Sequence, residues 1–185
     1  MAQALLIVDI QNDYFPGGAM ELVGSREAGL QAGVLLQAFR QAGRSIVHIQ
    51  HLAARPGATF FLPGTSGAEI HASAAPLPEE LVFQKHFPNS FRETPLLDHL
   101  RGQVITELVI AGMMTHMCID TTVRAAFDLG FSCQLAQDAC ATRDLTRNGA
   151  TVSAAQVQAA FLTAIDGTFA KVRSVDELCA GLSSR

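Results

Sequence analysis

An acid, an amine and a thiol stand at corresponding places along this sequence. Asp9 ends one short apolar segment, Lys85 ends a second, and Cys118 follows a third. A thiol attacks a carbonyl carbon once it has lost its proton, a carboxylate can take that proton, and an ammonium group can stabilise the sulfur anion. We therefore predict a triad in which Cys118 is the nucleophile, Asp9 the general base and acid, and Lys85 their charged partner.

The turn before Cys118 could serve the same chemistry. A helix N-terminus and a nearby ammonium both lower the pKa of a thiol, so a lowered pKa is predicted for Cys118. Acyl transfer also needs N–H donors for the developing oxyanion. The backbone amides of Met114 and Cys118 are the predicted donors.

Short segments rich in Val, Ile and Leu alternate with longer segments of helical periodicity. The predicted strands are residues 5–9, 45–50, 81–85, 107–111, 132–138 and 168–172. The predicted helices are residues 26–42, 96–101, 118–129, 153–165 and 175–182. In the first helix, Leu30, Val34 and Ala38, flanked by Leu35 and Phe39, form an apolar stripe.

This alternation predicts the fold class. Apolar strands that alternate with helices form a mostly parallel sheet covered on both faces. We predict a three-layer α/β/α sandwich with a six-stranded, Rossmann-like sheet, folded as one domain over residues 1–185. Ligands of such sheets bind beyond the carboxyl ends of the strands, where Asp9, Lys85 and Cys118 are expected to meet.

Composition narrows the function classes. The 185 residues are 49% hydrophobic and 16% charged, with a net charge of -4, which argues against nucleic acid as a partner. No apolar segment has the roughly 20 residues of a membrane span, and no export signal precedes residue 5, so a cytoplasmic protein is expected. The cysteines at 118, 133, 140 and 179 lack disulfide or metal-finger spacing. The high apolar content predicts a homo-oligomer, a dimer or tetramer.

Three motifs resemble those of a known family. Residues 9–14 read Asp-Ile-Gln-Asn-Asp-Tyr, residues 85–91 read Lys-His-Phe-Pro-Asn-Ser-Phe, and residues 112–122 read Gly-Met-Met-Thr-His-Met-Cys-Ile-Asp-Thr-Thr. In this order they resemble the motifs of the isochorismatase-like cysteine hydrolases, which include nicotinamidases and carbamoylsarcosine amidase. The chain departs from the family pattern at Tyr14, in place of Phe, and at Asn89-Ser90, in place of Ser-Ala.

The resemblance carries roles to matching positions. It implies the isochorismatase-like hydrolase fold, with Asp9 as base, Lys85 as charged partner and Cys118 as nucleophile. It also implies a cis peptide between Met113 and Met114 that turns the Met114 N–H toward the oxyanion.

Nicotinamidases of this family hold a divalent metal with an Asp-x-His element after the second strand. This chain has His48-Ile-Gln-His51 there, so Gln50 cannot supply the carboxylate. Residues three apart in a strand face opposite ways, which prevents His48 and His51 from chelating together, and His71 would leave the ligand set incomplete. We predict no metal and no other cofactor.

A small molecule is the expected substrate. The predicted pocket residues are Gln11, Tyr14, Gln50, His51, Phe61, His71, Phe91 and His116, with Phe60 as a further wall. The leading hypothesis is hydrolysis of a small amide or related C–N bond through a thioester on Cys118. Two alternatives stay open: a vinyl-ether hydrolase of the isochorismatase type, in which the thiol is a bystander, and a catalytically silent family member that acts as a binding protein.

Overall fold

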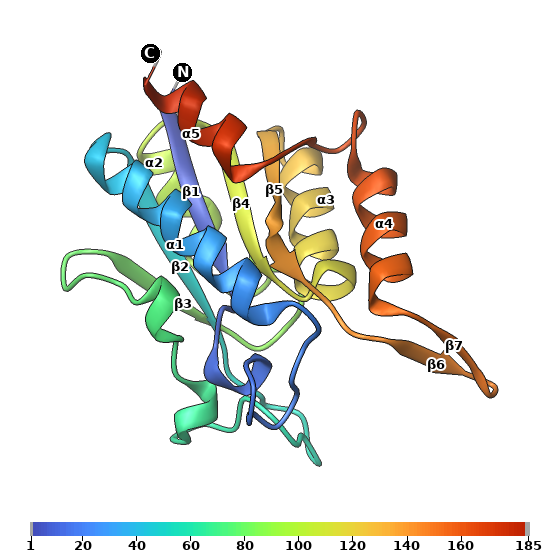
Figure 1. The fold of residues 1–185 in the computed structure, drawn as a ribbon. Coiled ribbons are helices and arrows are strands. Elements are labelled where there is room, and N and C mark those ends of the chain that lie inside the picture. The colour runs from blue at the N-terminus through green and yellow to red at the C-terminus, as the bar shows by residue number, and fades with distance from the viewer. Residues whose placement is uncertain (1, 184–185) are drawn as a thin grey trace.

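The computed structural model describes residues 2–183, so residues 1, 184 and 185 of the predicted domain lie outside it. Within this range, six strands form one sheet in the order β3-β2-β1-β4-β5-β8, and every pairing in it is parallel (Figure 1). The strands are β1 (Ala2–Val8), β2 (Ser45–His51), β3 (Leu81–Lys85), β4 (Ile105–Met113), β5 (Ser132–Ala141) and β8 (Lys171–Arg173). The predicted sheet is confirmed.

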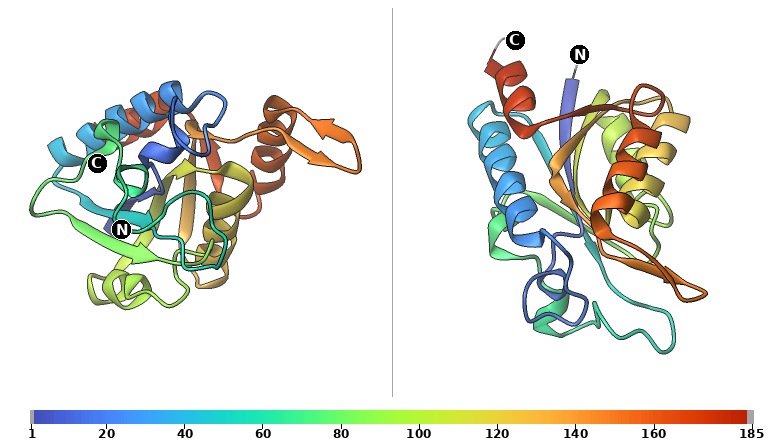
Figure 2. Two further views of the ribbon diagram at one scale, coloured as in Figure 1. Left: turned by 90° about the horizontal axis from the view of Figure 1, so that it is seen from below. Right: turned by 45° about the vertical axis from the view of Figure 1, so that its right-hand side comes forward.

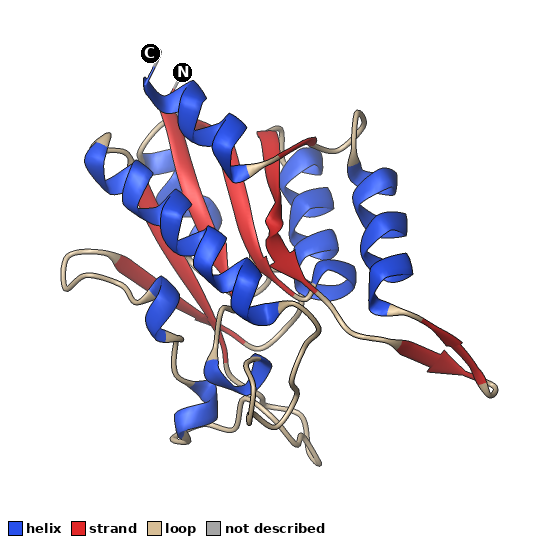
Figure 3. Ribbon diagram, in the orientation of Figure 1, coloured by secondary structure: helices blue, strands red, loops and turns tan. Residues whose placement is uncertain are grey.

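Helices cover both faces of the sheet (Figures 2 and 3). One face carries α1 (Ser25–Gln41) and α5 (Val175–Ser183), which pack against each other. The other face carries α2 (Leu96–Gly102), α3 (Asp120–Asp128) and α4 (Ala154–Ile165). This is the predicted three-layer α/β/α sandwich.

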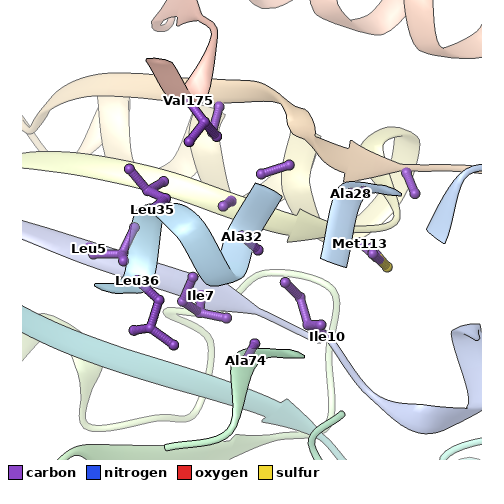
Figure 4. Packing of buried hydrophobic residues seen from close by; sticks show 14 of the residues in the cluster. Leu5, Ile7, Ile10, Ala28, Ala32, Leu35, Leu36, Ala74, Met113 and Val175 are labelled. Atoms are coloured by element: carbon purple, nitrogen blue, oxygen red, sulfur yellow. The ribbon is translucent and has the colours of Figure 1, made fainter. Parts of the chain in front are cut away.

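Alternate residues of β1 belong to the two hydrophobic cores of the sandwich, one on each face of the sheet. Leu5 and Ile7 pack under α1, where Ala32 and Leu36 meet them (Figure 4). Successive side chains of a strand point to opposite faces, so Leu6 belongs to the second core, under α2 and α3. Because both faces are covered by helices, β1 is apolar from Ala4 to Val8, and Gln3 is its one buried polar residue.

The apolar stripe predicted on α1 is only half correct. Leu35 and Phe39 are buried, but the exposed fraction is 68% for Leu30 and 52% for Val34. Each lies two positions from Ala32, which is buried against the sheet, and two positions correspond to about 200° around a helix. Leu30 and Val34 therefore face solvent.

The long connection between β2 and β3 is fastened to the loop after β1. The backbone of Gln11 bridges to Ile70, and the N–H of His71 donates to the carbonyl of Ile10 at 2.9 Å. Short 3₁₀ turns at Ser66–Ala68 and Ala72–Ala74 shape this connection. The carboxyl edge of the sheet is thereby enclosed by chain from two separate loops.

A two-stranded hairpin was not predicted. β6 (Leu145–Arg147) and β7 (Ala150–Val152) pair antiparallel and project from the body of the molecule (Figure 1). Asn148 and Gly149 join them, both with positive φ, as a type I′ turn requires. The Asn-Gly dipeptide is the sequence signal for this turn.

Among the described residues, no helix is long and apolar enough to cross a bilayer.

Candidate active site

The ammonium group of Lys85 is the centre of the site. Lys85 ends the edge strand β3, and its side chain is fully buried. Its Nζ atom lies close to four acceptors: Asp9 Oδ2 at 2.7 Å, His51 Nδ1 at 3.0 Å, the carbonyl oxygen of Phe87 at 3.1 Å and Cys118 Sγ at 3.2 Å. Burial alone would lower the pKa of Lys85, but the charges of Asp9 and Cys118 raise it above its ordinary value. The amine therefore stays charged.

Asp9 faces Lys85 from the end of β1. Its backbone is left-handed, with φ of +54°, and its N–H donates to the carbonyl of Ile49 at 3.0 Å. The carboxylate is fully buried, and Oδ2 takes the Lys85 ion pair. The other oxygen, Oδ1, is buried without a hydrogen-bond partner among the described residues. A carboxylate oxygen of Asp9 lies within 4.8 Å of Cys118 Sγ, so an acceptor is available for the thiol proton.

Cys118 sits in a turn that the sequence did not predict. The predicted helix 118–129 is instead a π-helical turn, Thr115–Ile119, followed by α3. Cys118 is the fourth residue of that turn, not the first residue of the helix. π-Helical turns are rare and occur mainly at functional sites, because the wider backbone turn displaces a side chain from its regular position.

The prediction of a lowered thiol pKa is wrong. Cys118 is only 5% exposed, and burial raises the pKa of its thiol well above the ordinary value; the charge of Asp9 raises it further, and Lys85 offsets this only in part. The sequence indicated a nearby ammonium, which lowers the pKa of a thiol, but it did not indicate that the Cys118 thiol is buried. At neutral pH Cys118 is therefore protonated.

Hydrogen-bond counting gives the resting arrangement. Lys85 has three N–H protons for four acceptors, and a protonated thiol does not need one of them. The three N–H groups then serve Asp9 Oδ2, His51 Nδ1 and the Phe87 carbonyl, and the thiol proton of Cys118 has the Asp9 carboxylate as a nearby acceptor, with one of its oxygens within 4.8 Å of Sγ. Once Cys118 loses its proton, Lys85 can redirect an N–H to sulfur at 3.2 Å.

His51 joins this cluster from the end of β2. Burial lowers the pKa of His51 to about 4, so the ring is neutral at pH 7. Because Nδ1 accepts from Lys85, the ring proton is on Nε2. Gln11 clamps the His51 backbone, accepting from its N–H at 2.7 Å and donating to its carbonyl at 2.9 Å.

The types of ligand atom here are those that bind metals, since Asp9, His51 and Cys118 bring an oxygen, a nitrogen and a sulfur within 4.8 Å of one another. In this structure the group that contacts all three residues is the Lys85 ammonium, which is itself a cation. The region matching the metal element of nicotinamidases does not fit a metal: His48 bonds Glu80 through Nε2 at 2.9 Å, and Gln50 donates to the carbonyl of Ala68 at 2.9 Å.

Cys118 opens into a cavity of about 520 Å³. Aromatic and aliphatic side chains dominate its wall, and Met114 and Cys118, the predicted oxyanion donors, are both part of it. The peptide bond between Met113 and Met114 is cis. The lining residues are Tyr14, His51, Ala53, Ala54, Arg55, Gly57, Ala58, Thr59, Phe60, Phe61, His86, Phe87, Pro88, Met114, Met117 and Cys118.

Of the predicted pocket residues, Tyr14, His51 and Phe61 line this cavity, as does Phe60. Gln11 and Gln50 do not. Their side-chain amides donate to the carbonyl of Ala68, at 2.8 and 2.9 Å. These two glutamines therefore fix the long connection to the ends of the strands.

His71, Phe91 and His116 also lie outside the cavity lining. The His71 ring stacks on Phe15 with centroids 3.5 Å apart, and Phe91 stacks on Phe131 at 6.0 Å. His116 belongs to the π-helical turn, and its Nδ1 lies 2.6 Å from the hydroxyl of Thr142, which directly follows β5. Their ring contacts organise the loops around the site.

Several cavity residues were missed by the sequence reasoning, chiefly Arg55, His86, Phe87 and Met117. His86 and Phe87 directly follow Lys85, so their closeness to the site was a readable signal. Arg55 belongs to the long connection, whose path cannot be deduced from pattern.

The fold and the site define a class of α/β protein whose acid, amine and thiol converge at the carboxyl edge of a parallel sheet. Known proteins agree. A family model of the isochorismatase domain matches residues 3–177. The chain belongs to the isochorismatase family of hydrolases.

Individual relatives are similar to this chain over most of its length. An isochorismatase family protein of Bacillus subtilis, YddQ, is 46% identical over 95% of this chain and 98% of its own. A ureidoacrylate amidohydrolase of Variovorax paradoxus is 27% identical over 94% of this chain and 79% of its own. A solved structure from Oleispira antarctica, assigned to the isochorismatase hydrolases, is 51% identical, with a TM-score of 0.93 over 97% of both chains.

Proposed function

We propose that this protein hydrolyses a small amide or related C–N bond through a thioester on Cys118. One observation carries the proposal: Cys118 Sγ lies at the cavity wall, 3.2 Å from the Lys85 ammonium and within 4.8 Å of a carboxylate oxygen of Asp9. A nucleophile, a base and a counter-charge thus meet where a substrate can enter. The similarity to an amidohydrolase supports a C–N bond as the target.

In the first half-reaction, Asp9 takes the thiol proton as sulfur attacks the carbonyl carbon. The C=O electron pair moves onto oxygen, and the N–H groups of Met114 and Cys118 stabilise that oxyanion. When the carbonyl re-forms, the C–N bond breaks, and Asp9 returns the proton to the departing nitrogen. The products of this step are a thioester on Cys118 and a free amine or ammonia.

In the second half-reaction, water replaces the amine. Asp9 takes a proton from the attacking water, the new C–O bond forms, and the C–S bond breaks. Asp9 passes the proton that it took from water to the departing sulfur, which returns Cys118 to the thiol and Asp9 to the carboxylate. Throughout, Lys85 keeps Asp9 in place and offers an N–H to sulfur whenever it is anionic.

The test is a search for the acyl-enzyme. We expect wild-type protein, quenched in acid during turnover of a panel of small amides, to carry a mass increase on the peptide containing Cys118. Cys118→Ala should show neither adduct nor ammonia release, whereas Cys133→Ala, a buried cysteine away from the cavity, should show both. Ammonia release that survives in Cys118→Ala would contradict the thioester mechanism.

A further inference from the structure

The charges around the cavity are unbalanced. None of its described lining residues is acidic, and one of them, Arg55, carries a permanent positive charge. The carboxylate of Asp9 lies deeper and is already paired with Lys85 at 2.7 Å. The cavity wall is therefore net positive, although the whole chain has a net charge of -4.

Arg55 is presented by a well-defined turn. The N–H of Ala58 donates to the carbonyl of Arg55 at 3.2 Å, and between them Pro56 precedes Gly57, whose φ is +77°. Proline followed by a residue of positive φ is typical of a type II turn. The turn fixes the backbone of Arg55 at the wall.

The Arg55 side chain has no ion pair or hydrogen bond with the described residues. A ligand would therefore not have to displace an existing partner. A second cation reinforces the field, because the Arg92 guanidinium stacks 3.6 Å from the ring centroid of Phe87, a wall residue. Its own contact with Glu93 is 3.6 Å long, and both of these side chains are mostly exposed.

A positively charged cavity attracts anions and repels cations, and apolar walls concentrate that field. A guanidinium also offers two parallel N–H donors that match a carboxylate. The remaining wall, built from Tyr14, Phe60, Phe61 and Phe87, suits a short apolar or planar carbon skeleton. These features define a molecule with an amide at one end and an anion at the other.

We propose that the substrate is a small amide that carries a carboxylate, which Arg55 binds while the amide lies at Cys118. This inference rests on the proposed amide hydrolysis and adds the chemical class of the substrate. Arg55 acts in specificity and takes no part in bond breaking.

The experiment compares matched pairs of probes. Succinamate, glutaramate and phthalamate are each tested beside their methyl esters, which differ in losing the negative charge, and ammonia release is measured. We expect wild-type kcat/KM to be higher for at least one acid than for its ester. Arg55→Gln should lower kcat/KM for that acid by about 10- to 100-fold, mainly through KM, and change the ester by less than about twofold. Arg55→Lys should recover part of the loss.

Arg101→Gln is the control, because Arg101 is an exposed arginine of α2 outside the cavity lining, and it should leave both probes unchanged. Equal use of acid and ester, or an equal loss of both in Arg55→Gln, would overturn the proposal.

Binding separates this inference from the proposed function. The same pairs are titrated calorimetrically into Cys118→Ala, which keeps Arg55. If no probe releases ammonia, yet an acid binds more tightly than its ester and loses that preference in Cys118→Ala/Arg55→Gln, the amidase proposal fails and the charge inference stands. If acids bind no better than esters, the charge inference fails whatever the turnover.

Discussion

At the scale of single residues, the carboxylate of Asp9 faces both an ammonium group and a thiol. Oδ2 forms the ion pair with Lys85, Oδ1 is buried without a hydrogen-bond partner among the described residues, and one carboxylate oxygen lies within 4.8 Å of Cys118 Sγ. The same carboxylate therefore has opposite effects on Cys118. It can accept the thiol proton, but its charge, after burial, is the second cause of the raised thiol pKa.

This opposition gives a prediction with two readouts. Asp9→Asn removes the charge that raises the pKa of Cys118 and leaves Lys85, so alkylation of Cys118 by iodoacetamide should start at lower pH than in wild type. Lys85→Met removes the charge that lowers the pKa, so alkylation should start at higher pH. Amide hydrolysis should nevertheless fall in both, by about 10²- to 10⁴-fold in Asp9→Asn, because proton transfer is lost.

The measurement is the pH profile of the alkylation rate, followed by peptide mass spectrometry at Cys118, beside ammonia release. Alkylation profiles that move in the same direction in the two variants would refute this account of the cluster.

At the scale of the elements, the close approach of β4 to β1 has no room for a side chain. A Cβ on Gly112 would lie 1.9 Å from the carbonyl oxygen of Val8, and the φ of Gly112 is +141°. Val8 directly precedes Asp9, and Gly112 directly precedes the turn to Cys118. The close contact therefore sets the spacing between the acid and the thiol.

We expect Gly112→Ala to lower the free energy of unfolding by about 2–5 kcal/mol, because overlap and backbone strain add. Gly102→Ala is the matched control, since a Cβ there meets nothing within 4 Å. Urea unfolding followed by circular dichroism would measure both. Equal stability of the two variants would show that β1 and β4 can separate without cost.

The long connection is tied to the sheet by an ionic cluster before β3. Glu80 takes two hydrogen bonds from Arg40 of α1, at 2.7 and 2.8 Å, and one from His48 of β2. Burial alone would raise the pKa of Glu80, but Arg40, the N–H of Leu77 and His48 together lower it to about 2. The ionised carboxylate therefore stabilises the folded protein.

A depressed folded-state pKa sets the sign of the pH dependence. The contribution of Glu80 is complete above about pH 4.5 and is lost as pH falls toward 2. Glu80→Gln should lower the free energy of unfolding by about 1–3 kcal/mol at pH 7, and this deficit should shrink between pH 5 and pH 3. Urea titrations across that range test it, with the exposed neighbour Glu79→Gln as control. A deficit that is constant with pH would exclude the ionic cause.

At the scale of the whole molecule, apolar side chains that face solvent suggest where copies of the chain meet. Leu30 and Val34 share one side of α1 and are 68% and 52% exposed. We expect light scattering to give two or four times the mass of one chain, and Leu30→Glu/Val34→Glu to shift it toward one. Val104→Glu, at another exposed apolar position, should not. If Val104→Glu dissociated the oligomer and the α1 variant did not, the contact between copies would lie near Val104 and not on α1.

Much of this architecture could be predicted from the sequence. Hydrophobic segments of strand length gave the end of β3 correctly and the ends of β1 and β4 to within two residues, and parallel sheets bring such ends to one edge. The sequence alone therefore predicts that Asp9, Lys85 and Cys118 lie together. Motifs that match a family then assigned their roles.

The rest depended on burial and on the path of loops, which sequence patterns do not encode. Gln11 and Gln50 were predicted to line the pocket, yet their amides hold the backbone of the long connection. Arg55 was missed because that connection has no periodicity. The pKa of Cys118 was predicted with the wrong sign because charge is visible in a sequence, whereas depth below the surface is not.

Lys85 stands on β3, and β3 pairs only with β2 among the described strands. An outermost strand frays more readily than a central one, since it loses one ladder of hydrogen bonds instead of two. If β3 separated from β2, water would reach the Lys85 ammonium. The ammonium would then lose its contacts with Asp9, His51 and Cys118 together, while both hydrophobic cores stayed packed. The candidate active site should therefore be lost at a lower free energy than the two cores that support it.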